Sequence, residues 1–405
     1  MRKLLIGFLL LGTNPFSYSQ AKEFSNELID TTLTNFQNKW KIPGLSIAIA
    51  KDGRLIYAKG FGYADTTKKI LVTPNHLFRF SSCTKTMTSL ALMQLVENGK
   101  ISVDDNVFGE KGILNSSLYS NITDSLIYLI KVKHLLRHNV GWPDIDIIGE
   151  NTASIELNLP IPAGIEENVK YFLLQKQEFY PGTQFRYANV NYLFLGQIIS
   201  ELSGKTYKDH IIDNFLPQLG IKTVFPSSSD INDIPPNAVL HYDYQGEMLP
   251  WVFDTTKLVP ESYSNNSLPM LADGAWVMRP IDMVRIILAM DGLDYPEDIV
   301  NNETLELMTS LNTEIKKPYA MGMYVVKGRW FHSGAWSWGN GAIWMKTKNN
   351  VCYAIATNTL PNTGTTEEEK YETMARYLRE LIELLPDEFN NITSYPNIDL
   401  FDEYY

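Results

Sequence analysis

Cysteine is scarce in this sequence, which removes several classes of protein from consideration. The 405 residues include two cysteines, Cys83 and Cys352, and no Cys-x-x-Cys pair. Two thiols are too few for a disulfide framework, and the spacings of structural zinc sites and redox motifs are missing. The sequence leaves open whether the two cysteines are bridged to each other.

An excess of positive charge is also missing. The chain has 35 lysines and arginines against 46 aspartates and glutamates, a formal net charge of −11 at pH 7. Binding to nucleic acid depends on cationic side chains that neutralise phosphates, so this balance argues against a nucleic-acid partner. The hydrophobic share of 44% and the charged share of 20% are typical of a folded protein and exclude disordered, collagenous and coiled-coil chains.

Long hydrophobic runs are lacking except near the first residue. Two cationic residues precede the apolar stretch 4–11, and residues 17–19 (Ser-Tyr-Ser) are similar to a signal-peptidase cleavage site. We therefore expect residues 1–19 to be a signal peptide and the mature chain to begin near Gln20. No later stretch reaches the roughly 18 apolar residues of a transmembrane helix, so we expect a secreted or periplasmic protein without a transmembrane anchor.

Periodicity in the first hundred residues predicts a helix, a β-hairpin and a second helix. Apolar residues recur at helical spacing between residues 24 and 36. Residues 44–50 and 54–60 flank a Lys-Asp-Gly turn, which is typical of two strands in a tight hairpin. A further helix is expected over residues 82–98, capped by Ser81 or Ser82.

The rest of the chain divides into a mainly helical part and a second group of strands. Between residues 100 and 280, helix-like segments are separated by long, polar, proline-containing loops. A helix is predicted at 281–290, and strands follow at 322–330, 342–345 and 351–356. The last helix begins at a cap, Thr365 or Thr366, and its apolar stripe ends at Leu385.

Together these segments predict an α+β fold. Strands from both ends of the chain should join one antiparallel sheet, with the two end helices on one face and an inserted helical region on the other. Three parts are expected after the signal peptide. The α/β subdomain comprises residues 20–81 and 280–390, the mainly helical subdomain comprises residues 82–279, and an acidic C-terminal tail comprises residues 391–405.

The helix predicted from residue 82 starts with Ser82-Cys83-Thr84-Lys85. Side chains three residues apart on a helix are neighbours, so a Lys85 amine whose pKa is lowered by burial can take the proton of the Ser82 hydroxyl. Ser19-x-x-Lys22 has the same spacing, and a helix cap beside a surface lysine explains the pattern as well. The pattern alone therefore does not identify a nucleophile.

A second pattern, Tyr187-Ala188-Asn189, offers a phenol and an amide to the same proton network. Three other Tyr-x-Asn tripeptides occur in the chain. Tyr187 differs from them because it follows the turn at 181–183 and precedes an amphipathic helix that Asn189 or Asn191 can cap. An ordinary half-buried core tyrosine is the alternative for this residue alone.

The third pattern is Phe331-His332-Ser333-Gly334, at the edge of a predicted strand. Gly334 would let a substrate backbone approach closely. The backbone N–H groups of Ala335 and Ser82 would then form a two-donor oxyanion hole. A strand-edge histidine hydrogen-bonded to backbone is the alternative for His332.

Two other sites are weighed and not favoured. Residues 335–339 are similar to a nucleophile elbow around Ser337, but a strand is predicted after them and an elbow requires a helix. His134 and His138 have the spacing of metal ligands on a helix, yet the glutamate and the third ligand of such a motif are missing. We therefore predict no metal and no cofactor, and a structural role for both histidines.

In this order, Ser82-x-x-Lys85, Tyr187-x-Asn189 and His332-x-Gly334 resemble the motifs of a family of serine hydrolases that includes class C β-lactamases, D-alanyl-D-alanine carboxypeptidases and esterases. The resemblance extends from about residue 25 to residue 385. Further segments similar to the family are 43–45, 78–82, 135–138, 141–144, 181–183, 191–192 and 272–274. The resemblance implies the β-lactamase/transpeptidase-like fold, in agreement with the α+β arrangement predicted from periodicity.

The resemblance also implies a role for each residue. Ser82 would attack a carbonyl and form an acyl-enzyme that water hydrolyses. Lys85 and Tyr187 would relay the proton, and Asn189 would orient Lys85 and the substrate amide. Many class C β-lactamases have Lys-Thr-Gly where this chain has residues 332–334, and a histidine is mostly neutral at pH 7. Recognition of a free carboxylate or a β-lactam is therefore less expected. The carboxypeptidase and esterase branches of the family tolerate a histidine there, so the resemblance favours these two activities.

We thus expect an exported serine hydrolase that acts on an amide or ester. The substrate would be a small molecule or peptide, such as a D-alanyl-D-alanine-type peptide, a carboxylic ester or a peptidoglycan fragment. A β-lactamase is the alternative within the family. A catalytically inactive relative that serves as a ligand sensor or scaffold is the alternative from another class.

Overall fold

Strands from both ends of the chain form one antiparallel sheet in the computed structural model, which describes residues 22–143, 145–336 and 339–405. The strand order is β11-β12-β13-β14-β2-β3-β4. The bounds are β2 Gly44–Lys51, β3 Arg54–Asp65, β4 Ile70–Leu71, β11 Tyr324–Val326, β12 Arg329–Trp336, β13 Asn340–Lys346 and β14 Val351–Thr357. Because β2 from the first part of the chain pairs with β14 from the last, the predicted union of both ends is confirmed.

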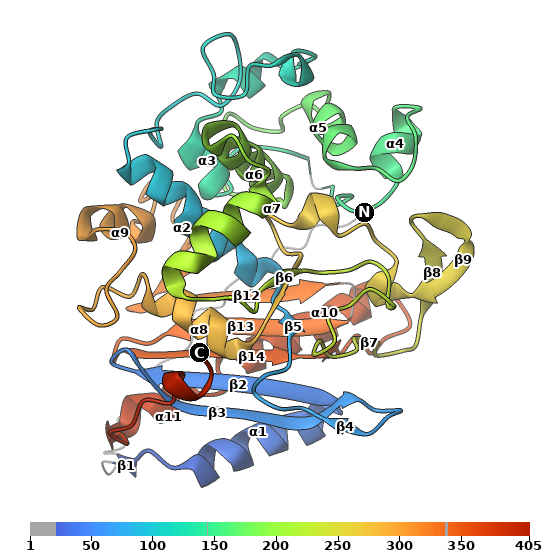
Figure 1. Ribbon diagram of the computed structural model, residues 1–405. Coiled ribbons are helices and arrows are strands. Elements are labelled where there is room, and N and C mark those ends of the chain that lie inside the picture. The colour runs from blue at the N-terminus through green and yellow to red at the C-terminus, as the bar shows by residue number, and fades with distance from the viewer. Residues whose placement is uncertain (1–21, 144, 337–338) are drawn as a thin grey trace.

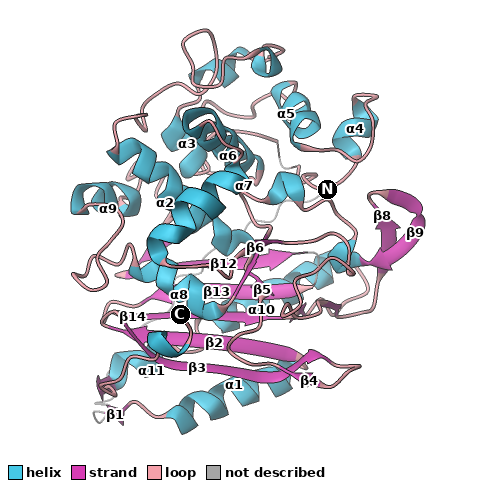
Figure 2. Ribbon diagram, in the orientation of Figure 1, coloured by secondary structure: helices cyan, strands magenta, loops and turns pink. Residues whose placement is uncertain are grey.

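Helices lie on both faces of this sheet and in a separate region beside one edge. In Figures 1 and 2 the strands lie in the lower half of the molecule, with α3 to α6 above them and α1 below. The bounds are α1 Asn26–Trp40, α2 Thr84–Glu97, α3 Val132–Leu136, α4 Thr152–Glu156, α5 Ile165–Leu173, α6 Val190–Ser203, α7 Tyr207–His210, α8 Pro280–Leu288, α9 Asn302–Thr309, α10 Glu367–Ile382 and α11 Pro386–Asn391.

The central strands are buried on both faces, and the size of their side chains alternates. In β2, Ile47 and Ile49 belong to the hydrophobic cluster that includes α1 and α10, whereas Ala48 and Ala50 belong to the other cluster. Successive side chains of a strand point to opposite faces, so this alternation gives one face of large residues and one of small residues. The small residues leave room for α8, which packs on β2 and β14.

The two end helices pack against each other on the face of large residues, as predicted. Tyr377 of α10 lies between Phe36 and Trp40 of α1, with ring centroids 5.4 Å apart in both pairs. The start of α10 is fixed by a capping box, in which the Thr366 hydroxyl accepts from the Glu369 N–H and the Glu369 carboxylate accepts from the Thr366 N–H.

The region between α2 and α8 is less helical than predicted. It contains a two-stranded hairpin, β8 (Met248–Trp251) and β9 (Asp254–Pro260), which extends at one side of the molecule (Figure 1). A three-stranded sheet is built from β6 (Phe225–Pro226) and β10 (Trp276–Met278) together with β5 (Phe78–Arg79). The prolines of these segments suggested loops, but both strands of an isolated hairpin are edge strands, where proline is tolerated.

Residues 391–405, predicted to be an acidic tail, return to the body of the protein. In this segment, β16 (Ile392–Ser394) pairs in parallel with β1 (Lys22–Glu23). Further along, the backbone N–H of Leu400 donates to the carbonyl of Leu55 in β3 at 2.8 Å. The sequence predicted only an acidic tail, and the structure shows that backbone pairing anchors this segment.

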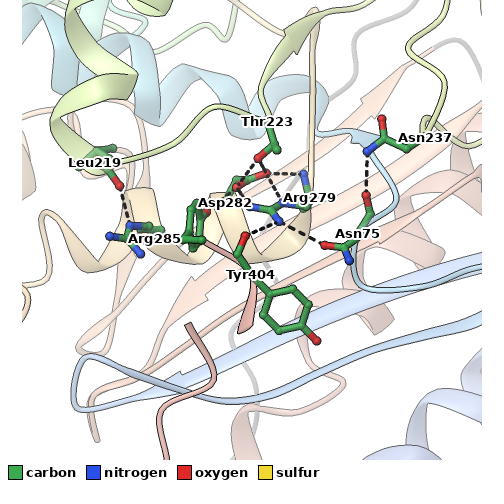
Figure 3. A network of polar contacts seen from close by, with 9 residues as sticks. Asn75, Leu219, Thr223, Asn237, Arg279, Asp282, Arg285 and Tyr404 are labelled. Atoms are coloured by element: carbon green, nitrogen blue, oxygen red, sulfur yellow. Dashed lines mark hydrogen bonds and ion pairs between the residues drawn. The ribbon is translucent and has the colours of Figure 1, made fainter. Parts of the chain in front are cut away.

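Aromatic residues at the end of this segment join a polar network at the start of α8 (Figure 3). Asp282 is fully buried and accepts hydrogen bonds from Arg279 at 2.7 Å and from the Thr223 hydroxyl at 2.8 Å. Arg279 also donates to the carbonyl of Tyr404 at 3.2 Å, and the Tyr405 hydroxyl donates to Asp282. The buried carboxylate is therefore paired with a cation and fully hydrogen-bonded, which is what burial of a charge requires.

Both cysteines are free, and each lies buried in the hydrophobic core. The thiol of Cys83 donates to the carbonyl of His332 at 3.3 Å. The predicted signal peptide lies outside the described residues. Within them, the helices are all too short or too polar to cross a bilayer.

Candidate active site

Ser82 lies where the helical region meets the sheet. It occupies the 3-10 turn Ser81–Cys83, which packs against β12 and leads into α2. The prediction that Ser81 or Ser82 caps α2 is wrong, since neither side chain makes a capping hydrogen bond and Cys83 holds the position before the helix. Both hydroxyls have other partners: that of Ser81 bonds to Asn340, and that of Ser82 lies 3.0 Å from the Lys85 amine.

The turn is held in a strained conformation. Ser81 has φ 46°, in the left-handed region that residues other than glycine rarely adopt. The Asn340 amide fixes it by donating at 3.0 Å to the Ser81 hydroxyl and at 3.0 Å to the Arg79 carbonyl. Strain beside a reactive group persists only where surrounding contacts enforce it. The direction of the Ser82 side chain is therefore set by the fold.

Lys85 is fully buried, and its amine contacts three acceptors. It donates to Ser82 Oγ at 3.0 Å, to Asn189 Oδ1 at 2.8 Å and to the carbonyl of Asp273 at 2.8 Å. Burial lowers the pKa of Lys85 to about 8, although the charges of Asp273 and Asp146 oppose this shift. A larger fraction of free amine is thus present at neutral pH than for an ordinary lysine. This is the property that a proton acceptor for serine needs.

Tyr187 completes the contacts of Ser82. Its hydroxyl hydrogen-bonds to Ser82, and its ring centroid lies 5.0 Å from the Lys85 amine. Burial raises the pKa of Tyr187 well above its ordinary value, so the hydroxyl stays protonated and can donate. Tyr187 is half-buried, as the alternative interpretation of an ordinary core tyrosine expects. That interpretation does not account for its contact with Ser82.

Asn189 connects the lysine to a carboxylate that the sequence analysis missed. Asn189 precedes α6 without capping it through its side chain. Its Oδ1 accepts from Lys85, and its Nδ2 donates to both oxygens of Asp146, at 2.9 and 3.1 Å. Asp146 is exposed and lies in an irregular loop, where no periodic pattern distinguishes one polar residue from another.

Asp273 is the second group that was missed. Its side chain is buried, and within the described residues its Oδ1 has no hydrogen-bond partner. Burial raises the pKa of Asp273 to about 7, and the nearby charge of Lys85 opposes this shift. Its tripeptide with Ala272 and Gly274 resembled a family segment, but nothing in that segment indicated that the carboxyl lies beside the lysine.

His332 is 2% exposed and directs both ring nitrogens into the protein. Its Nδ1 contacts the carbonyl of Ser333 at 2.6 Å, so this nitrogen is the donor, and its Nε2 accepts from the Tyr319 hydroxyl at 3.2 Å. Burial lowers the pKa of His332 to about 3, which keeps the ring neutral. These contacts agree better with the alternative interpretation, a histidine hydrogen-bonded to backbone, than with a side chain that binds substrate.

Gly334 permits a close approach, but the group that lies close to it is the protein's own backbone and not a substrate. A Cβ atom at this position would lie 2.3 Å from the Phe80 carbonyl oxygen and 3.0 Å from the Ser82 nitrogen. Glycine therefore allows β12 to pack directly on the turn that carries Ser82. The oxyanion hole of the Ser82 and Ala335 N–H groups stays a prediction.

His138 and His134 make separate structural contacts. The buried ring of His138 lies 4.2 Å from the Tyr187 ring, and its Nδ1 accepts from the Asn191 amide at 2.9 Å. His134 Nδ1 accepts from the Lys131 N–H at 3.2 Å at the start of α3. In the part of the chain that is described, no cluster of three or more ligating side chains could hold a metal. Ser337 lies outside the described residues.

The fold and these contacts define a class of protein. A serine hydroxyl, a buried lysine amine and a phenol share one hydrogen-bond network at the junction of an antiparallel sheet and a helical region, which is the arrangement of serine hydrolases with a Ser-x-x-Lys motif. The chain belongs to the Beta-lactamase family, whose model matches residues 29–376.

Individual relatives agree with this assignment. Protein flp of Staphylococcus aureus (strain MW2) is 26% identical over 386 residues, which cover 91% of this chain and 71% of that protein. Among solved structures, FmtA from Staphylococcus aureus matches with a TM-score of 0.65 and 20% identity, covering 95% of each chain. The D-amino acid amidase from Ochrobactrum anthropi SV3 matches with a TM-score of 0.64 and 21% identity, covering 90% of this chain and 98% of the amidase. The predicted β-lactamase/transpeptidase-like fold is therefore confirmed.

Proposed function

We propose that this member of the family is an exported serine hydrolase that cleaves an amide or ester through an acyl-enzyme on Ser82. The observation that carries the proposal is the buried Lys85 amine, 3.0 Å from Ser82 Oγ and with its pKa lowered to about 8. The free amine takes the hydroxyl proton as Oγ attacks the carbonyl carbon. Tyr187, hydrogen-bonded to Ser82, passes a proton to the leaving amine or alkoxide when the C–N or C–O bond breaks.

The second half-reaction reverses these proton movements. Water attacks the acyl carbonyl and gives its proton to the network, and Ser82 Oγ recovers a proton as the acid leaves. Backbone N–H groups of Ser82 and Ala335 are the proposed donors to the oxyanion in both steps. No metal or cofactor is required by this scheme.

The neutral His332 argues against a β-lactam as the acyl donor. Many class C β-lactamases have a lysine where this chain has a histidine whose nitrogens are both engaged within the protein. A solved relative is a D-amino acid amidase complexed with L-phenylalanine amide, which supports a small amide as acyl donor. Because the family's carboxypeptidase and esterase branches tolerate a histidine at this position, we place carboxylic esters and D-alanyl-D-alanine-type peptides, including peptidoglycan fragments, ahead of β-lactams.

A fluorophosphonate probe tests the hydrolase directly. We expect covalent tagging of the wild-type protein at Ser82, detected by mass spectrometry, and none in Ser82→Ala. Lys85→Ala should lose tagging while its circular dichroism spectrum stays native. If the folded wild type is not tagged between pH 6 and 10, the chain is an inactive sensor or scaffold instead.

A substrate panel separates the subtypes. Turnover of a p-nitrophenyl ester, a D-Ala-D-Ala peptide and a chromogenic cephalosporin would distinguish esterase, peptidase and β-lactamase, and we expect the cephalosporin to be the slowest. The export that the sequence of residues 1–19 suggests is tested by N-terminal sequencing of protein from the culture medium or periplasm. A mature chain that retains Met1 would contradict export by signal cleavage.

A further inference from the structure

We propose that Tyr319 is a positioning residue of this site, whose hydroxyl keeps the proton of the His332 ring on Nδ1 and thereby fixes the backbone that leads to Ala335. Tyr319 does not touch the substrate in this scheme and acts through His332. The inference rests on the proposed hydrolase function, and it gives a role in that reaction to a residue outside all three sequence motifs.

The first step concerns the protons of the His332 ring. Nδ1 lies 2.6 Å from the Ser333 carbonyl oxygen, and Nε2 lies 3.2 Å from the Tyr319 hydroxyl. A carbonyl oxygen only accepts hydrogen bonds, so Nδ1 carries a proton. A second proton would make the ring a cation, which burial and the charge of Lys85 disfavour. Nε2 is therefore an acceptor, and the Tyr319 hydroxyl is its donor.

The second step concerns what happens to the ring when this donor is removed. In a neutral imidazole, the hydrogen bond made by one nitrogen decides which of the two carries the proton. Without the Tyr319 hydroxyl, Nε2 of His332 loses the partner that the described part of the chain gives it. We expect the proton to move to Nε2. Nδ1 then presents a lone pair to the Ser333 carbonyl, and because two acceptors repel each other, this contact opens.

The Ser333 carbonyl matters because it belongs to the peptide group that precedes Gly334. Glycine has no side chain to restrict its backbone, so neighbouring contacts must fix this peptide group. Among the described residues, β11 pairs with β12 only as far as Phe331, and beyond it β12 is paired with β13 alone. The bond from His332 thus fixes the peptide group next to the one that carries the Ala335 N–H, a proposed donor to the oxyanion.

Tyr319 is itself held firmly in place. Its hydroxyl also hydrogen-bonds to that of Tyr192, which contacts the Ser89 hydroxyl at 3.1 Å and the Leu136 carbonyl at 3.2 Å. The segment that follows packs on α2, where a Cβ atom at Gly322 would lie 2.3 Å from Ser89 Oγ. Hydrogen bonds therefore join α2, α6 and β12, the elements on which the three motifs lie or into which they lead.

Nitrogen-15 NMR of the histidine side chains tests the position of the proton without any substrate. The chain has six histidines, and the signals of His332 are identified by their loss in His332→Asn. At pH 7.5 we expect a neutral ring with the proton on Nδ1 in the wild type, and on Nε2 in Tyr319→Phe, which keeps the aromatic ring and lacks the hydroxyl. A wild-type proton on Nε2, or an unchanged proton position in Tyr319→Phe, overturns the proposal whether or not the protein is a hydrolase.

Turnover of a neutral p-nitrophenyl ester tests the effect on the reaction. Tyr319→Phe should lower kcat about tenfold and leave KM within about threefold, because the oxyanion exists only in the transition state and the tetrahedral intermediate. In His332→Asn, the amide nitrogen takes the place of Nδ1 and can still donate to the Ser333 carbonyl, but no group takes the place of Nε2. In that background, Tyr319→Phe should lower kcat by less than about twofold.

Tyr377→Phe is the matched control, because Tyr377 is fully buried in α10 and its hydroxyl bonds to that of Thr357 at 2.8 Å. It should change neither the His332 proton nor kcat. If Tyr319→Phe lowers kcat by the same factor in the wild-type and His332→Asn backgrounds, the loss is structural and the proposal is overturned. A wild-type kcat in Tyr319→Phe also overturns it, while the hydrolase function stands. If the ester is not hydrolysed in a Ser82-dependent manner, both proposals fail.

Discussion

Replacing Asp273 with asparagine should move the pH dependence of Ser82 acylation to lower pH. Among the charges near Lys85, the Asp273 carboxylate is the one that most favours the ammonium form. Asparagine keeps the shape of the side chain and the backbone carbonyl that binds Lys85, but it removes the charge. The pKa of Lys85 should therefore fall below its wild-type value of about 8. Because acylation needs the free amine, its rate should rise at a lower pH.

The size of the shift follows from Coulomb's law. Two opposite unit charges about 6 Å apart interact by roughly 3 kcal/mol at an effective dielectric constant of about 20, which corresponds to about two pKa units. Burial raises the pKa of Asp273 to about 7, so its carboxyl is ionised in most molecules where Lys85 titrates. Because partial protonation weakens the interaction, we expect the midpoint of acylation to fall by about one to two pH units.

Stopped-flow measurement of the p-nitrophenol burst from a neutral ester, between pH 5 and 9.5, provides the assay. Asp273→Asn should reach its plateau at lower pH than the wild type. The control Glu110→Gln, which removes one exposed carboxylate from a turn beyond the far end of α2, should not differ from the wild type. An unchanged or higher midpoint in Asp273→Asn would refute the reasoning, because it would mean that Asp273 does not hold a charge beside the lysine or that Lys85 is not the group that titrates.

Three further changes have defined outcomes. The pKa of Asp273 is raised from 3.8 to about 7 in the folded state, so this residue lowers stability as pH rises through that window. At pH 8, the free energy of unfolding of Asp273→Asn in urea should therefore exceed that of the wild type by up to about 4 kcal/mol. At pH 4 the two values should be equal. Gly334→Ala places a Cβ 2.3 Å from the Phe80 carbonyl and should slow acylation about 100-fold with native circular dichroism; a wild-type rate would show that β12 does not fix Ser82. Asp282→Asn leaves buried Arg279 without its counter-charge and should lower the free energy of unfolding in urea by about 3 kcal/mol; a change below about 1 kcal/mol would contradict this.

Regular elements were predictable from the sequence because their patterns are local. The hairpin of β2 and β3 follows from two apolar runs around Lys51-Asp52-Gly53, and the structure pairs Lys51 with Arg54 across this turn. The start of α10 follows from Thr366 and three glutamates, and the capping box is present. In both cases the residues that determine the element lie within a few positions of it.

The candidate site was predictable in part. The motif order brought Ser82, Lys85, Tyr187 and Asn189 to one place, and the structure joins them by hydrogen bonds. The burial of His332 could not be predicted, because it depends on Tyr319, a residue that belongs to none of the motifs. Asp146 and Asp273 were missed because their places in the site also depend on contacts between residues far apart in the sequence.

The two carboxyls act on Lys85 in the same direction, but from different positions. Burial lowers the pKa of Lys85, and the charges of Asp273 and Asp146 limit this fall so that both protonation states exist near neutral pH. Asp273 does this from a buried position, where the substrate does not reach it. Asp146 does it from an exposed position, where it accepts from the Asn189 amide.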